Sequence, residues 1–141
     1  MADSPPYNGT FFYRRDSLLY RQMREALASK GDFLQEFKEK GVFLDDLVLY
    51  PINQFKDLNE RNGHRRKGVL SLAQRMADYR PGAVVALMCA IEPMVVDAMR
   101  DADLSHVPLY VTPFPRPEHQ KRFKEKLTEI VQKLPVTKPA D

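Results

Sequence analysis

The chain has 141 residues, of which 43% are hydrophobic and 29% are charged, and its formal net charge is +3 at pH 7. This size predicts one domain at residues 1–134, followed by a flexible tail at residues 135–141. No apolar run reaches the roughly 20 residues that a membrane-spanning helix requires, so we expect no membrane partner. Nothing in the sequence decides the oligomeric state.

Cysteine usage and the N-terminal sequence favour a reducing compartment. The segment MADSPPYNGT has no basic stretch followed by an apolar one, so it is not a signal peptide. Cys89 is the only cysteine, and alone it can form neither an internal disulfide nor a structural zinc or iron–sulfur site. We therefore expect a soluble cytoplasmic protein with no metal or other cofactor, in which Cys89 belongs to the core.

The first part of the chain predicts two helices. Asp16 is expected to cap the first helix, which Gly31 ends. Asp32 is expected to cap the second, which Gly41 ends. Apolar residues repeat at helical spacing in both, at Leu18, Leu19, Met23 and Leu27 and then at Phe33, Leu34 and Phe37.

Three strands alternate with helices in the rest of the chain. A strand at Val42–Tyr50 is followed by a polar loop to Lys67 and a helix at Val69–Arg80. The apolar run Ala83–Cys89 predicts a strand covered on both faces, which is typical of parallel sheets. The remaining expected elements are a helix at Ile91–Ala102, a strand at Val107–Thr112 and a helix at Pro117–Leu134.

This order predicts the α/β class, as a three-layer α/β/α fold with a small parallel sheet. In such folds ligands bind beyond the carboxyl ends of the strands. Three groups of basic residues lie in or beside predicted loops, and two of them follow such ends. They are either solvated loop residues or a surface for nucleic acid: Arg14 and Arg15; Arg61, Arg65, Arg66 and Lys67; Arg116, Lys121 and Arg122.

Two features could carry chemistry in the absence of a standard catalytic signature. Asp45 and Asp46 interrupt an apolar strand, where a carboxylate is costly unless it has a partner. They either lie at a sheet edge or helix end, or accept N–H groups of a ligand. Phe11, Phe12 and Tyr13 beside two arginines either form a platform on which bases stack or cover the core.

Several segments, in their order along the chain, resemble the motifs of the uracil-DNA glycosylase superfamily. The matches cover five family motifs in turn: the acidic-proline motif, the aromatic loop, the strand with its uracil-reading end, the helix with the next strand, and the last loop. The matching segments are ADSPP (2–6), GTFFYRRDSLLYRQ (9–22), GVFLDDLVLYPIN (41–53), SLAQRMADYRPGAVVALMC (71–89) and TPFPRPEHQKRF (112–123).

The resemblance implies roles for single residues near the base. Asp3 matches the acidic residue that positions the attacking water, and Phe11 or Phe12 matches the aromatic that stacks on a flipped base. Asp45 falls nearest the asparagine that reads the uracil edge, and Asn53 ends the same segment. Base flipping suits this chemistry because a glycosidic bond cannot be attacked inside a base stack.

The resemblance also implies a surface that contacts the DNA backbone. Thr112 begins the last loop, at the position of the histidine that is usual in catalytic members. The residues expected along the DNA backbone are Arg65, Arg66, Pro113, Pro115, Arg116, His119 and Arg122.

Three departures from the family pattern argue against activity. Thr112 lacks the histidine donor, and Asp45 lacks the paired donor and acceptor of an asparagine. The hydrophobic strand that lies mid-sheet in the family does not precede Asp3, so we expect a start further upstream or a shortened form. We therefore expect a glycosylase-like domain that binds DNA and excises little or no uracil. The alternative is a non-catalytic α/β module that binds a nucleotide or a protein.

Overall fold

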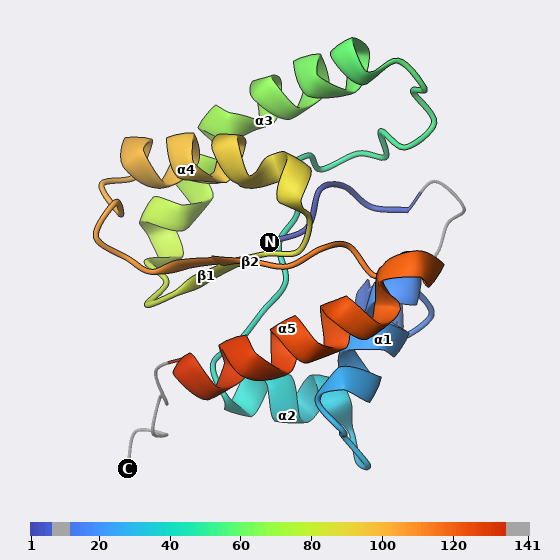
Figure 1. The fold of residues 1–141 in the computed structure, drawn as a ribbon. Helices are drawn as coiled ribbons and strands as arrows, with labels where there is room; N and C mark the ends of the chain where they lie inside the picture. The colour runs from blue at the N-terminus through green and yellow to red at the C-terminus, as the bar shows by residue number, and fades with distance from the viewer. Residues whose placement is uncertain (7–11, 135–141) are drawn as a thin grey trace.

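The structure is a computed structural model that describes residues 1–6 and 12–134 (Figure 1). Phe11 and the expected tail at residues 135–141 lie outside these ranges. In chain order the elements are η1 (Phe12–Arg14), α1 (Leu18–Ala26), α2 (Phe33–Glu39), α3 (Leu58–Tyr79), β1 (Val84–Ala86), η2 (Cys89–Ile91), α4 (Glu92–Asp101), β2 (Leu109–Val111), η3 (Pro117–His119) and α5 (Gln120–Lys133).

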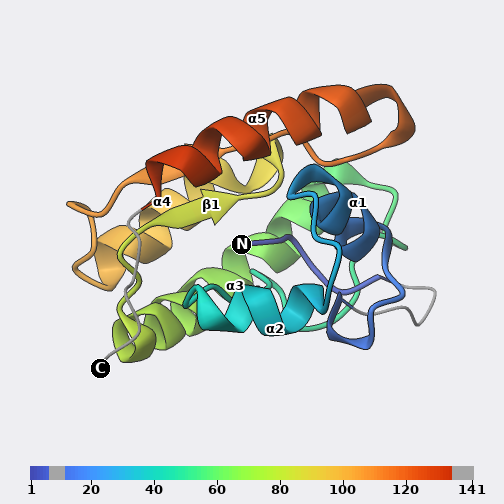
Figure 2. The ribbon, with the colours of Figure 1, turned by 90° about the horizontal axis from the view of Figure 1, so that it is seen from below.

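The α/β architecture has three layers, as the sequence predicts. Strands β1 and β2 are parallel, and Val84 pairs with Leu109 in their register. Helices α3 and α4 cover one face of the sheet, whereas α1, α2 and α5 cover the other (Figures 1 and 2).

Two short segments extend the sheet beyond β1. The backbone N–H of Leu87 donates to Met1 O at 2.8 Å, and the buried Met1 amine donates to a carbonyl of β1. On the other side of this segment, Ala2 N donates to Asp45 O and Leu47 N donates to Ala2 O, both at 2.9 Å. The parallel ribbons therefore run in the order 45–48, 1–3, β1, β2, so residues 1–3 lie inside the sheet, next to β1.

The expected strand Val42–Tyr50 is wrong in extent. Only the segment 45–48 makes sheet-like backbone hydrogen bonds, through an isolated parallel bridge between Ala2 and Asp46. The segment 1–3 offers too few backbone groups to pair with nine residues. The other two strands are also shorter than expected, with three residues each.

Each face of the sheet has its own core cluster. Alternate residues of a strand point to opposite faces. Val84 and Ala86 accordingly belong to the cluster under α3 and α4, while Leu87 belongs to the cluster under the other three helices. Cys89, which was expected in the core, is exposed because it lies past the end of β1 in η2.

Helix α3 begins earlier than the sequence predicts. The residues up to Lys67 were expected to form a loop, but Asp57 caps a helix there and its side chain accepts from Asn59 N at 3.0 Å. The buried face of α3 runs through Arg65, Val69, Leu72, Ala73 and Met76. Because this face starts with an arginine, apolar periodicity detects only its second half.

A glycine lets α3 lie close to the segment 45–48. A Cβ atom added at Gly68 would lie 2.5 Å from the carbonyl oxygen of Leu47, which is closer than such atoms approach. Gly68 lowers intrinsic helix stability by roughly 1 kcal/mol relative to alanine. Its place in mid-helix therefore follows from the contact with the backbone of this segment.

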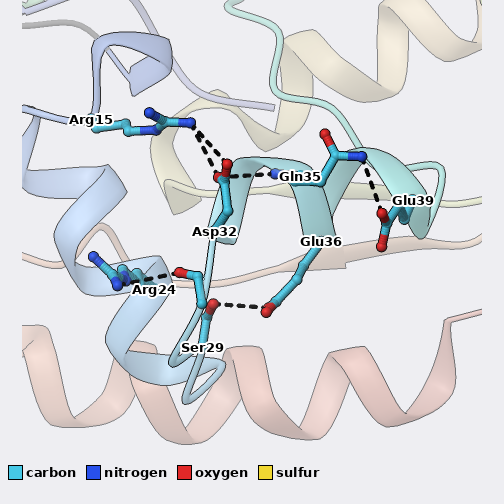
Figure 3. A network of polar contacts seen from close by, with 8 residues as sticks. Arg15, Arg24, Ser29, Asp32, Gln35, Glu36 and Glu39 are labelled. Atoms are coloured by element: carbon cyan, nitrogen blue, oxygen red, sulfur yellow. Dashed lines mark hydrogen bonds and ion pairs between the residues drawn. The ribbon is translucent and has the colours of Figure 1, made fainter.

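A polar network closes the connection between α1 and α2 (Figure 3). Asp32 caps α2 as expected and accepts from Gln35 N at 3.3 Å, and the same carboxylate accepts from Arg15 at 3.1 Å. Ser29 Oγ donates to Glu36 Oε2 at 2.8 Å. Arg15 thus stabilises this helix start, and it is not one of the purely solvated loop residues.

The start of α1 corrects one further expectation. Ser17 rather than Asp16 caps α1, because Ser17 directly precedes the helix and its Oγ accepts from Tyr20 N at 3.1 Å.

The pKa of Asp46 in the extended sheet predicts a specific pH dependence of stability. It is raised to about 6, first because burial disfavours the carboxylate and second because the Asp45 carboxylate is near. Between about pH 4 and pH 6 the folded chain retains a proton that the unfolded chain releases. The free energy of unfolding contributed by Asp46 must fall as the pH rises through this window, by at most about 1.4 kcal/mol per pH unit.

Replacing Asp46 by Asn should remove this contribution. Denaturant unfolding of the wild type and Asp46→Asn at several pH values from 4 to 6 measures it. We expect the stability of the wild type relative to the variant to decline as the pH rises. If the free energies of unfolding of the two proteins changed with pH in parallel, the raised pKa of Asp46 would be contradicted.

Candidate nucleic-acid interface at the carboxyl ends of the strands

The four parallel ribbons end at one side of the sheet. The chain leaves β1 toward α4 and leaves β2 toward α5 on the same side of the molecule (Figure 1). Residues following the two extra segments also meet there, since Ile52 N donates to Ser4 Oγ at 3.4 Å. This side, which we call the carboxyl edge, is where the α/β topology predicts a ligand.

A largely buried ion pair lies at the carboxyl edge. Arg65 Nε donates to Asp3 Oδ1 at 2.9 Å, and Arg65 Nη2 donates to Asp3 Oδ2 at 2.8 Å. The remaining Arg65 nitrogen donates to Asn62 Oδ1 at 2.9 Å, and Nη2 also approaches Met88 Sδ at 3.6 Å. The side chains are 3% and 14% exposed for Arg65 and Asp3.

This pair changes the expected roles of both residues. Both carboxylate oxygens of Asp3 accept from Arg65, so this carboxylate serves as the partner of a buried guanidinium. Arg65 was expected to contact the DNA backbone, which is wrong because its guanidinium is buried and already bound by a carboxylate. Its position on the buried face of α3 is the physical reason.

Arg66 is also engaged within the fold. Its guanidinium is 52% exposed but forms an ion pair with Asp97 of α4, which also pairs with Arg100 at 3.1 Å. Successive helix residues point about 100° apart, so Arg66 faces α4 while Arg65 faces the sheet. The expected DNA-backbone surface therefore contains neither of these arginines in a free form.

The loop after β2 is packed at its start and open at its end. Thr112 is 0% exposed, its N–H donates to Ala86 O at 2.9 Å, and its Oγ1 has no hydrogen-bond partner among the described residues. Pro115 is also fully buried, so its expected contact with a DNA backbone is wrong, while Pro113 is half-buried.

The end of this loop and the first turn of α5 carry exposed cations. Arg116 and Arg122 are exposed, and neither has an ion-pair partner within the described ranges. His119 is half-buried and its backbone N–H donates to Arg116 O at 2.8 Å. Of the residues expected along a DNA backbone, these two arginines keep the accessibility that this role requires.

Phe12 cannot stack on a base. Its ring is 3% exposed and has aromatic neighbours on several sides. The expected stacking role is therefore wrong for Phe12. Phe12 instead covers the core, which was the alternative interpretation. The ring centroids that surround it lie at 5.1 Å (Tyr13), 5.8 Å (Tyr20), 6.3 Å (Phe33) and 5.8 Å (Phe37).

Asp45 lies at the other end of the ribbons. It begins the segment 45–48, so in a parallel arrangement it is at the amino edge, away from the end of residues 1–3. Its carboxylate accepts from Arg75 Nε at 2.9 Å and from the Tyr79 hydroxyl at 3.2 Å. The expected role in reading a base is therefore corrected to a structural one. Asn53, in contrast, is exposed in the loop at the carboxyl edge.

A group of aromatic rings at the carboxyl edge does not follow from the expectations above. Tyr50 and Phe55 lie in the loop after the segment 45–48, and His64 lies on α3. The ring of His64 is stacked on Phe55 with centroids 4.5 Å apart, and its Nδ1 shares a hydrogen bond of 2.7 Å with the Tyr50 hydroxyl. The Asp57 cap was the available signal, because an earlier helix start would have placed His64 on a helix.

Comparison of the chain with protein-family models, with curated proteins and with solved structures found no match. Across residues 1–6 and 12–134, no helix is long and apolar enough to cross a membrane. In the same ranges, no three His, Cys, Asp or Glu side chains gather so that they could hold a metal ion.

The buried pair predicts very different effects at two neighbouring arginines. Arg65→Ala should lower the free energy of unfolding by about 3 kcal/mol or more, because it leaves the Asp3 carboxylate buried and unpaired. Arg66→Ala is the matched control, with an expected loss below about 1 kcal/mol for an exposed pair. Urea denaturation measures both. Equal stability of the two variants would contradict the structural role of Arg65.

Proposed function

We propose that this chain is a uracil-DNA glycosylase-like domain that binds DNA at the carboxyl edge and does not excise uracil. The observation that carries the proposal is the placement of exposed, unpaired Arg116 and Arg122 at the edge where all four parallel ribbons end. A cytoplasmic location is part of the proposal.

The charges support binding to a polyanion. Arginines form strong hydrogen bonds with phosphate, and binding to DNA releases the counterions condensed on it. The exposed residues around this edge also include Lys56, Lys67 and Lys121. Since Arg65 and Arg66 are engaged within the fold, the loop and helix start after β2 supply the two arginines.

The packing at the same edge argues against base excision. Hydrolysis of a glycosidic bond requires a positioned water and a group that stabilises the leaving anion, and such a group supplies on the order of 3 kcal/mol. Asp3 has both oxygens bound by Arg65, and Thr112 is fully buried. The carboxylate of Asp3 is engaged by an arginine, and Thr112 presents no exposed donor to a leaving group.

DNA binding should depend on salt through the two exposed arginines. We expect Arg116→Ala with Arg122→Ala to weaken binding to any DNA sequence and to lower the salt slope by roughly one unit per lost contact. The control is Lys133→Ala, at the far end of the same helix, where Lys133 pairs with Glu129 at 3.2 Å. Fluorescence anisotropy with a labelled oligonucleotide at several salt concentrations measures both. Absent or salt-independent wild-type binding would favour the alternative, a nucleotide- or protein-binding module.

Uracil excision should be absent even where DNA is bound. We expect no cleavage at abasic sites when the protein is incubated with a uracil-containing single- or double-stranded oligonucleotide and then treated with alkali. An active uracil-DNA glycosylase on the same oligonucleotides is the positive control. Robust turnover by the wild-type chain would overturn this part of the proposal.

A further inference from the structure

Three aromatic rings form one continuous group at the carboxyl edge. His64 lies parallel to Phe55, with an interplanar angle of 7°. The ring of Tyr50 meets His64 edge-on, with centroids 5.5 Å apart. Phe55 also packs against the core cluster under α3 and α4, which holds the group in place. The group is therefore anchored to the core, and its members come from the loop before α3 and from α3 itself.

Tyr50 is the exposed member of the group, whereas Phe55 and His64 are half-buried. Tyr50 is 45% exposed, and two leucines close to the group along the chain, Leu49 and Leu58, are 62% and 55% exposed. Single exposed apolar residues are common on protein surfaces, but several together indicate a surface that binds a partner.

Unpaired cations surround the rings. Arg61 lies one helical turn before His64, and no carboxylate pairs with it in the part of the chain that the structure describes. Its Nε is buried without a hydrogen-bond partner among these residues. Lys56 adjoins Phe55, and Lys67 lies one turn after His64; both are exposed. Two carboxylates also lie nearby along the chain: Asp57, which caps α3, and Glu60, which is exposed in the first turn of α3.

We propose that Tyr50, Phe55 and His64 form a site on which a base of single-stranded DNA stacks, with Arg61 contacting the adjacent phosphate. This inference rests on the proposed function and gives it a stacking site in place of the buried Phe12. Aromatic rings combined with cations along a backbone are the usual composition of sites for single strands. The π-face of any base fits such a site, so we expect no strong sequence preference.

A second aromatic pair, of which one ring is exposed, lies among side chains of different charge. Phe43 and Tyr79, with centroids 4.5 Å apart, line a groove of about 310 Å³ at the amino edge. Asp45, Arg75 and Asp78 line the same groove, and Arg75 pairs with Asp45, so the carboxylate of Asp78 leaves the groove with a negative charge that disfavours a phosphate. The groove therefore supplies a matched control, because Phe43 is as exposed as Tyr50.

The experiment compares substitutions at the two aromatic surfaces. Binding of the full chain to a labelled single-stranded oligonucleotide is measured by anisotropy for Tyr50→Ala, Phe55→Leu, His64→Ala and the control Phe43→Leu. We expect each of the first three to raise Kd on the order of tenfold without changing the salt slope, and the control to leave Kd unchanged. Arg61→Gln should lower the salt slope by roughly one unit.

A second oligonucleotide separates stacking from backbone contact. It has the same length but carries abasic sites in place of bases. The wild type should bind it on the order of tenfold more weakly, and His64→Ala should bind both oligonucleotides equally. Equal wild-type affinity for the two oligonucleotides would overturn the stacking site.

The outcomes distinguish this inference from the proposed function. If the wild type binds no DNA, the proposed function fails. If the wild type binds DNA and the aromatic substitutions change Kd no more than Phe43→Leu does, only the stacking site fails. Circular dichroism checks that each variant folds. Phe55 touches the core, so Phe55→Leu can unfold the protein. In that case Tyr50→Ala and Arg61→Gln decide whether the stacking site exists.

Discussion

The guanidinium of Arg65 and the carboxylate of Asp3 bring the first residues of the chain, the start of α3 and the end of β1 to one point. The Asp3 backbone oxygen also accepts from Val48 N at 2.9 Å, so the same residue joins the segment 45–48. A buried ion pair is costly unless further hydrogen bonds satisfy its remaining atoms. Asn62 and Met88 supply contacts of this kind to Arg65. The carboxyl edge is held together by this interaction, and its other features depend on it.

The same interaction links stability to function. A carboxylate and an arginine at a predicted ligand site are natural candidates for catalysis and for phosphate binding. Here they bind each other, so the charge of each is compensated inside the fold. Free cations are found further from the centre of the edge, at Arg61, Arg116 and Arg122. Cations that are spread along an edge can bind a long polyanion. Hydrolysis of one bond instead requires several groups to converge on a single reacting atom.

Much of the fold could be predicted because apolar periodicity reports directly on burial. The order of strands and helices after Val69 follows from it, and so does the parallel sheet. The errors arise where another force decides. Arg65 takes a core position through an ion pair, which lies outside any apolar pattern. The segment 45–48 is paired only as far as residues 1–3 allow, and a backbone partner is not visible in local sequence.

The location of the candidate site was predictable, whereas the roles of its side chains were not. Topology alone places it at the carboxyl ends of parallel strands. The role of a side chain depends on a partner that is distant in sequence, such as Arg75 for Asp45 or Asp97 for Arg66. Phe12 illustrates the same limit, since its aromatic neighbours come from α1 and α2.

Arg61, Arg65 and Arg66 show why the fold must be known before charge indicates function. All three are arginines within six residues of one helix, so the sequence does not distinguish them, yet each has a different environment. Arg65 faces the sheet and binds Asp3, Arg66 faces α4 and binds Asp97, and only Arg61 keeps a guanidinium without a carboxylate among the described residues. A phosphate can be bound only by charge that the fold has not already neutralised. The aromatic group at His64 lies one turn from that remaining charge, which is why the inferred binding site lies at Arg61 and not at the arginine nearest the centre of the edge.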